Sequence, residues 1–358
     1  MAGSPYASAL GRLKPDFPSF LPADVYPGLL GAKDPGDVAN LLEGTAYGPS
    51  LDYARATYTG PLLLEVAINR TFVHRNRHTL EATPFAGKPV VGAYLTRWDV
   101  QNIELILSAK AQGRPVTETE DHLVSSREIP AGLYAGVMTL DDVRLLLNQP
   151  TIEATVSALV KFGYGTTILP FLETFERSHN IFPILHALET EYYRNVLAAA
   201  KFFQGDEWVV RALLQSEIDV RNVLLLLKGK ASGLALDDVA GRWLEGGLLP
   251  AAQAPDLYAS RGVPELAERL EDRFPTIGEG AREYADHQSL TGYEAALERD
   301  RAVAELRRLK TYPLSLAILF AYLLRAELER SDLRRIVFGR TYGIPAERLA
   351  ALLVSPRL

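Results

Sequence analysis

Cysteine is absent from all 358 residues of the chain. Without thiols the protein has no disulfide, no thiolate metal site and no thiol nucleophile, and a reducing compartment suits it. Long apolar runs are also scarce. The longest one near the C-terminus, Tyr312–Leu324, is shorter than the roughly 18 residues that a membrane-spanning helix needs. We therefore expect a buried helix there and no direct membrane span.

An excess of basic residues is missing too. The chain holds 38 Lys and Arg against 44 Asp and Glu, for a net charge of −6, and its basic residues are not grouped in blocks. Proteins that bind nucleic acids more often carry a basic face. No nucleic-acid partner is therefore predicted.

The motifs of common enzymes and nucleotide-binding proteins are not found. The segment 87–89, GKP, lacks the upstream glycine and the following hydroxyl residue of a phosphate-binding loop, and neither GxGxxG nor GxSxG occurs. His74 and His78 lie four residues apart, as in some zinc-binding helices, which leaves a metal-dependent enzyme as one interpretation. Arg75 and Arg77 surround them with positive charge, which favours an exposed basic helix face. We predict no catalytic residue, cofactor or metal.

One sequence motif, which we call the repeated line, occurs three times. Residues 98–113 read WDVQNIELILSAKAQG, residues 218–233 read IDVRNVLLLLKGKASG, and residues 328–343 read LERSDLRRIVFGRTYG. Four positions are kept in type: an acid (Asp99, Asp219, Glu329), an amide or acid (Asn102, Asn222, Asp332), a cation (Lys110, Lys230, Arg340) and a glycine (Gly113, Gly233, Gly343).

Two further blocks precede each copy in the same order. A helical segment with a Leu-Glu pair surrounds Glu65, Glu189 and Glu298, and a short acidic helix start lies ahead of it, at 34–42, 139–147 and 262–270. This constant order predicts three helical repeat units, 1–124, 125–246 and 247–358. The apolar spacing is helical nearly throughout, so the predicted class is all-α. Thr139 and Thr151 are predicted helix N-caps, and the three glycines are predicted helix ends.

The kept polar residues are predicted to be buried. At about 100° per residue, Asp99, Asn102 and Lys110 share a helix face with Ile103 and Ile106. A buried polar group without a partner costs roughly 1–3 kcal/mol, so each of these residues should be bonded. We predict ion pairs of the cation with the Leu-Glu carboxylate: Glu65 with Lys110, Glu189 with Lys230 and Glu298 with Arg340. Their role is either architectural or that of a partner-binding surface.

The same residues carry a resemblance to a known family. The threefold line, each copy following a Leu-Glu helix, resembles the C subunits of the archaeal and bacterial V/A-type ATPases, the counterparts of the d subunit of the eukaryotic V-ATPase. The opening LLGAKDPGDVANLLEGTAYG (29–48) and the ending RRIVFGRTYGIPAERLAALLV (334–354) are similar to the family's ends. The third copy departs from the other two, with Glu329 for Asp and Asp332 for Asn.

The resemblance implies a non-catalytic coupling subunit of the central stalk. Three similar helical domains would form a pseudo-threefold funnel on the cytoplasmic face of the membrane rotor ring. The funnel would receive the end of the central shaft and transmit torque for ATP synthesis or ion pumping. The implied partners are the shaft subunits and the rotor ring, and the isolated chain is expected to be a monomer. A generic helical-repeat scaffold for protein binding stays open as an alternative, although its repeats usually run about 20–50 residues.

Overall fold

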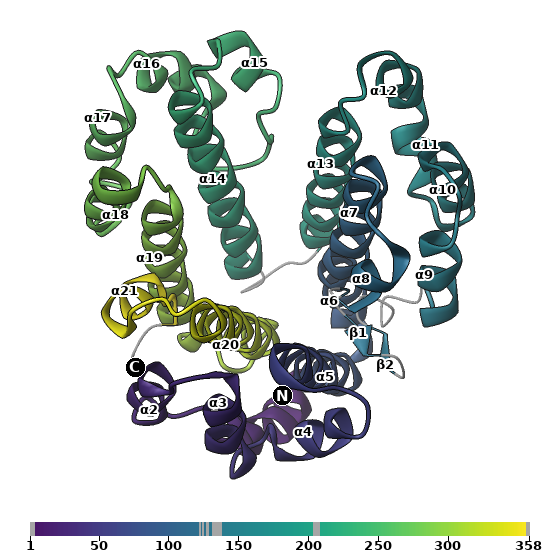
Figure 1. Ribbon diagram of the computed structural model, residues 1–358, viewed down its shortest axis with the longest axis vertical. Coiled ribbons are helices and arrows are strands. Elements are labelled where there is room, and N and C mark those ends of the chain that lie inside the picture. Colours follow the sequence, from purple (N-terminus) through teal and green to yellow (C-terminus); the bar gives the residue numbers. More distant parts are fainter. Residues whose placement is uncertain are drawn as a thin grey trace. The chain divides into compact units, whose positions relative to one another are not determined.

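The protein is described by a computed structural model that covers residues 4–121, 123, 125–126, 129–130, 138–202 and 208–355 (Figure 1). These residues are helical apart from turns and one pair of two-residue antiparallel strands, β1 (Ser125–Ser126) and β2 (Ile129–Pro130). The predicted all-α class is confirmed.

The helices of the first half include two long ones, α5 and α13. Their bounds are α1 Ala7–Leu13, α2 Val25–Gly31, α3 Pro35–Glu43, α4 Gly48–Arg55, α5 Gly60–Ala82, α6 Lys88–Leu95, α7 Arg97–Ala111, α8 Val116–Asp121, α9 Leu140–Leu147, α10 Ile152–Leu159, α11 Gly165–Ile168, α12 Leu172–Ser178 and α13 Phe182–Ala199.

The second half includes three long helices, α14, α19 and α20. The bounds are α14 Trp208–Ala231, α15 Leu236–Ala240, α16 Ala254–Tyr258, α17 Val263–Glu268, α18 Gly280–His287, α19 Thr291–Lys310, α20 Ala317–Thr341 and α21 Ala346–Leu352. Short 3-10 helices lie between these elements, at Lys14–Ser19, Phe85–Gly87, Val160–Phe162, Leu169–Phe171, Ala200–Phe202, Ala251–Gln253 and Ile277–Glu279.

The chain forms two compact units. The smaller unit holds residues 46–202, and the larger unit combines residues 1–45 with residues 203–358. The predicted division into three repeat units stays a prediction, and residue 124, the predicted end of the first of them, lies outside the described residues.

The core of the smaller unit is built around α5. Its residue Phe72 meets Trp98 of α7 edge to face at 4.8 Å. The guanidinium of Arg97 is buried and donates hydrogen bonds to the hydroxyls of Tyr94 and Tyr192, at 2.9 and 3.0 Å. These bonds satisfy a buried cation and tie α7 to α13.

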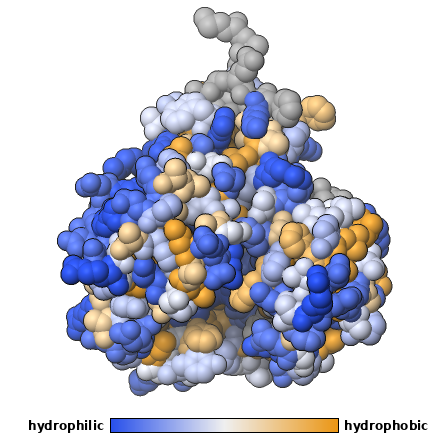
Figure 2. All heavy atoms as spheres, turned by 90° about the horizontal axis from the view of Figure 1, so that it is seen from above, coloured by the Kyte–Doolittle hydropathy of each residue, from blue (hydrophilic) through white to orange (hydrophobic). Residues whose placement is uncertain are grey.

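The core of the larger unit is formed by the long helices α14, α19 and α20. Helix α20 also packs against α1 and α3 at the start of the chain and against α21 at its end. The apolar run Tyr312–Leu324 contributes the first turns of α20, where Phe320 and Leu324 are fully buried, as predicted. Among the described helices, none combines the length and apolar character needed to cross a membrane. On the face seen in Figure 2, hydrophobic residues are interspersed with hydrophilic ones.

Two predicted helix starts are confirmed. Thr139 accepts a hydrogen bond from the backbone N–H of Asp142, whose carboxylate accepts one from the N–H of Thr139, so α9 begins with a capping box. Thr151 accepts a hydrogen bond from the N–H of Ala154 at the start of α10.

Candidate interaction site: three repeated helix junctions

The repeated line folds into the same local structure three times, which we call a junction. Each junction consists of the end of a long helix, a left-handed glycine and a short helix that begins three residues later: α7 with Gly113 and α8, α14 with Gly233 and α15, and α20 with Gly343 and α21. The φ angles of the three glycines are +66°, +65° and +67°. Only glycine adopts this region without strain, so the predicted helix ends are confirmed.

The same backbone hydrogen bond closes each helix end. The N–H after the glycine returns to a carbonyl five residues earlier: Arg114 to Ala109 at 2.9 Å, Leu234 to Gly229 at 3.0 Å and Ile344 to Gly339 at 2.8 Å. This six-residue closure is the Schellman ending of a helix. It directs the short helix back across the long one.

The accepting residue of this bond is small because the short helix lies directly over it. A Cβ atom at Gly229 would lie 2.5 Å from Cγ2 of Val239 in α15, and one at Gly339 would overlap the side chain of Leu349 in α21. Val239 and Leu349 are buried. A larger side chain at either glycine would therefore force the two helices apart.

The repeated cation binds backbone carbonyls. The ammonium group of Lys110 donates to the carbonyls of Leu147, at 2.8 Å, and Gln149, and that of Lys230 donates to the carbonyl of Tyr258 at 2.6 Å. Arg340 donates to the carbonyl of Ala32 at 3.2 Å. Burial lowers the pKa of Lys110. The cation thus satisfies carbonyls at or just beyond the ends of α9, α16 and α2, which have no partner within those helices.

The predicted ion pairs of these cations are corrected accordingly. Glu298 of α19 binds Arg335 of α20 at 3.1 Å instead of Arg340. Glu65 of α5 accepts a hydrogen bond from Asn69 at 3.3 Å, whereas the bonds of Lys110 go to carbonyls. Sequence spacing alone did not reveal backbone acceptors.

The third predicted ion pair, Glu189 with Lys230, is also corrected. Lys230 binds Tyr258 within that unit, whereas its predicted partner Glu189 is a half-buried residue of α13 in the smaller unit.

The carbonyls bound by the cation also correct the alignment of the acidic helix starts. Each cation binds a carbonyl two or four residues before the N-cap of a helix. Lys110 binds carbonyls four and two residues before Thr151, Lys230 binds one four residues before Gly262, and Arg340 binds one two residues before Asp34. Thr151, Gly262 and Asp34 are the N-cap residues of α10, α17 and α3. The counterpart of segments 34–42 and 262–270 is therefore α10, and the prediction that it is 139–147 was wrong.

The repeated acid is buried in all three copies, as predicted. Asp219 accepts a hydrogen bond from the N–H of Leu249 at 2.7 Å and pairs with Arg273. Glu329 accepts a hydrogen bond from the N–H of Leu21 at 2.6 Å. In both copies the acid holds the chain that enters the next short helix.

The acid of the first copy has a different environment. The hydroxyl of Tyr164 donates to Oδ2 of Asp99 at 3.3 Å, while Oδ1 has no hydrogen-bond partner and is buried. Burial raises the pKa of the Asp99 carboxyl well above its ordinary value, and the Tyr164 hydrogen bond opposes this only in part. Burial, together with the nearby Asp99 carboxylate, raises the pKa of Tyr164.

The exchange of Asn for Asp in the third copy has a geometric reason. Asn222 donates to the carbonyl of Leu244 at 2.8 Å and accepts from its N–H at 2.9 Å, which requires an amide. Asp332 instead accepts from two N–H groups, those of Val354 at 2.7 Å and Ser355 at 2.9 Å. Two donors require two acceptor oxygens, so a carboxylate replaces the amide. Burial raises the pKa of Asp332, and these N–H groups oppose the shift. Asn102, at the same position in the first copy, is buried.

The third junction is completed by the start of the chain. The first two junctions bind the segments that follow them, through Leu147 and through Leu249. The third binds Leu21 and Ala32, which lie more than 300 positions earlier in the sequence. The N-terminal segment therefore occupies at α20 the position that the next repeat occupies at α14.

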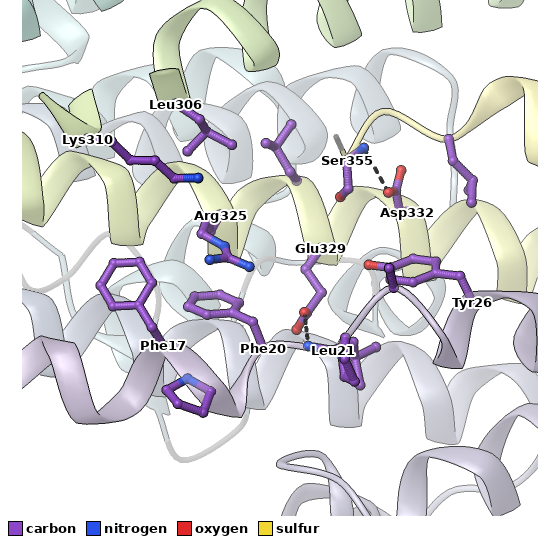
Figure 3. A pocket seen from close by; sticks show the side chains of 15 residues that line it. Phe17, Phe20, Leu21, Tyr26, Leu306, Lys310, Arg325, Glu329, Asp332 and Ser355 are labelled. Carbon is purple, nitrogen blue, oxygen red and sulfur yellow. Dashed lines mark hydrogen bonds between the residues drawn. The ribbon is translucent and has the colours of Figure 1, made fainter. Parts of the chain in front are cut away.

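A cavity of about 430 Å³ lies beside the third junction (Figure 3). Phe17 and Phe20 form part of its wall, and the Arg325 guanidinium lies 5.7 and 5.1 Å from the centroids of these two rings. Lys310, the last residue of α19, lines the same space. Of the junction residues, Glu329 and Asp332 border the cavity, but their carboxylates are bonded to backbone N–H groups.

The geometry favours an architectural role for the repeated residues. The acids, the amides and the cations are bonded within the protein and hold each long helix to the next pair of short helices. The sequence did not reveal their partners Tyr164, Arg273 and Leu21, since two of these donate from positions outside the repeated line and the third donates from the backbone.

Comparison with known proteins finds the family that the repeated line resembles. Residues 17–352 match the family model described as ATP synthase (C/AC39) subunit. The chain is 34% identical to the C subunit of the A-type ATP synthase of Thermoplasma acidophilum, over 98% of this chain and 99% of that protein. It is 31% identical to the same subunit of Thermoplasma volcanium, over 98% of both chains, and 25% identical to that of Methanocaldococcus jannaschii, over 89% of this chain and 78% of that protein. The chain belongs to the family of ATP synthase C/AC39 subunits, the family that its sequence resembles.

Proposed function

We propose that this protein is a non-catalytic coupling subunit of the central stalk of an A/V-type ATPase. It links the central shaft to the membrane rotor ring and transmits torque during ATP synthesis or ion pumping. Its place is the cytoplasmic side of the membrane, where it is held through the complex, and the isolated chain is a monomer.

The observation that carries the proposal is the way in which the third junction is completed. Each junction fixes a long helix to the short helices of the next repeat, and the last junction takes these helices from the N-terminal segment, through Leu21 and Ala32. A chain whose last repeat binds its first segment favours a closed arrangement of three repeats. Three helical domains in a closed arrangement would form a pseudo-threefold funnel with one mouth for the end of a shaft.

The contacts at the junctions suit the transmission of force. Helix ends tied by buried, charge-assisted hydrogen bonds resist relative movement more than helices held by surface ion pairs do. Glu217 of α14 and Arg301 of α19, both buried, lie 3.9 Å apart and add a further link between long helices.

Co-purification tests the proposed place in the complex. A tagged copy of the full chain is expressed in its source cells, and membranes are solubilised gently before capture. We expect the nucleotide-binding subunits, the shaft subunits and the ring protein to be captured with it. Capture of unrelated proteins without any ATPase subunit would refute the proposal.

A further inference from the structure

Large apolar side chains are exposed where α14 begins and α19 ends. Trp208 and Leu314 are each 52% exposed. The ring of Trp208 meets that of Tyr312 edge to face at 5.9 Å, which places the start of α14 beside the connection from α19 to α20. Exposed tryptophan beside other apolar side chains is typical of surfaces that bind a partner.

Three cations belong to the same end of this helix pair. Ser216 of α14 is hydrogen-bonded to Glu305 of α19, and this contact with the ring pair sets the two helices antiparallel. At a rise of about 1.5 Å per residue, Arg211, Arg307 and Lys310 lie within roughly 8 Å of the ring pair along the helix axes. All three side chains are exposed.

These cations are not neutralised by the described part of the chain. Within residues 4–121, 123, 125–126, 129–130, 138–202 and 208–355, Arg211, Arg307 and Lys310 form neither an ion pair nor a side-chain hydrogen bond. The neighbouring Arg308 is paired with Glu305, at 2.9 and 3.1 Å. A group of unpaired cations stands out in a chain whose net charge is −6.

Helix stability explains only part of this arrangement. Basic residues in the last turn of α19 interact favourably with the negative end of the helix dipole, which accounts for Arg307 and Lys310. Arg211 lies in the first turn of α14, where a positive charge is disfavoured, and this turn, described from Trp208 onward, contains no acidic residue. The exposure of Trp208 has no explanation in helix stability either.

We propose that this surface, made of Trp208, Arg211, Arg307, Lys310, Tyr312 and Leu314, docks an acidic segment of a partner subunit that also carries apolar side chains. The proposal rests on the proposed function, which supplies the partner subunits. Positive charge on one side and negative charge on the other speeds association and selects the partner, while the apolar side chains supply burial. Anionic lipid would meet the same cations, but three unpaired cations are fewer than the roughly four to eight that typically hold a protein to such lipid.

Charge reversal in the assembled complex tests the docking surface. The tagged full chain carries Arg211→Glu with Lys310→Glu, and it is captured from solubilised membranes at about 0.15 M salt, where exposed charges are partly screened. The matched control is Lys228→Glu, an exposed lysine at the other end of α14. Circular dichroism and the thermal midpoint of each isolated variant confirm folding. A second variant, Trp208→Ser, removes the aromatic contact without changing the charge.

We expect the double reversal to lower the captured amount of ATPase subunits about tenfold, since two exposed ion pairs of up to ~1 kcal/mol each are lost, and we expect Trp208→Ser to lower it as well. Lys228→Glu should match the unmodified chain. Equal capture by all variants would overturn the inference and leave the proposed function intact. Failure of the unmodified chain to capture any ATPase subunit would refute the proposed function itself. Binding of the isolated chain to phosphatidylglycerol vesicles, abolished by the double reversal, would identify lipid as the occupant and also overturn the inference.

Discussion

The repeated acid has opposite energetic roles in the first and second copies. Asp99 is fully buried and one of its oxygens has no partner, whereas Asp219 accepts a backbone hydrogen bond and pairs with Arg273. We predict that Asp99→Asn stabilises the smaller unit at neutral pH and that Asp219→Asn destabilises the larger unit. The same substitution at aligned positions thus changes the free energy of unfolding in opposite directions.

The size of the first effect depends on pH. Because burial raises the pKa of Asp99 in the folded chain, the folded state keeps a proton that the unfolded state releases above the ordinary value of 3.8. The contribution of Asp99 to stability is therefore full below pH 3.8 and falls as pH rises towards the folded pKa. Each pH unit between these two values lowers the free energy of unfolding of the Asp99 chain by up to about 1.4 kcal/mol. The advantage of Asp99→Asn in the free energy of unfolding should therefore grow as pH rises from 3.8 towards the folded pKa.

Urea unfolding followed by tryptophan fluorescence measures this difference. Trp98 is the one tryptophan of the smaller unit, so a background with Trp208→Phe and Trp243→Phe reports on that unit alone. For Asp219→Asn, loss of the charge from one buried and one partly buried contact should lower the free energy of unfolding by about 2–4 kcal/mol, seen as a lower thermal midpoint. An advantage of Asp99→Asn that does not grow as pH rises above 3.8, or a stabilising effect of Asp219→Asn, would contradict these assignments.

Three further substitutions and one control substitution test the junctions through the urea midpoint. Gly229→Ala should destabilise the larger unit by about 1–3 kcal/mol, because the new methyl group meets Val239 at 2.5 Å; an unchanged midpoint would show that the short helix moves freely. Gly113→Ala should lower the free energy of unfolding by about 1 kcal/mol, because its φ of +66° is unfavourable for alanine. No steric clash adds to this loss, because the space around Gly113 is open; a gain in stability would contradict the left-handed geometry. Lys110→Met should cost about 1–3 kcal/mol because it leaves the carbonyls of Leu147 and Gln149 without their donor, and Lys228→Met, an exposed lysine, should leave the midpoint within about 0.5 kcal/mol.

The sequence was sufficient for the helical class, the helix ends and the burial of the repeated acids and amides, whereas the repeated cations are half-buried. Glycine at a helix end and an acid among aliphatic residues are local signals, and each copy repeated them. It was not sufficient for the partners, because Lys110, Lys230 and Arg340 bind backbone carbonyls. Every residue carries a carbonyl, so an acceptor of this kind leaves no mark in the sequence.

The completion of the third junction left only a short signal in the sequence. Leu21 donates its backbone N–H to Glu329, as Leu249 does to Asp219, and both leucines begin a Leu-Pro-Ala triplet, at 21–23 and 249–251. The acidic helix starts were misaligned for a related reason. Both 139–147 and 151–159 begin with a threonine cap and an acid, and only the carbonyls bound by Lys110 distinguish them.

Coupling between ATP hydrolysis and ion transport is the property that the proposed role of this chain controls. Membrane vesicles from cells that lack this chain, and vesicles to which the purified chain has been added back, are assayed for both activities. We expect vesicles without the chain to hydrolyse ATP without transporting ions, and the added chain to restore transport. Ion transport that proceeds equally well without the chain would contradict its role as the coupling subunit.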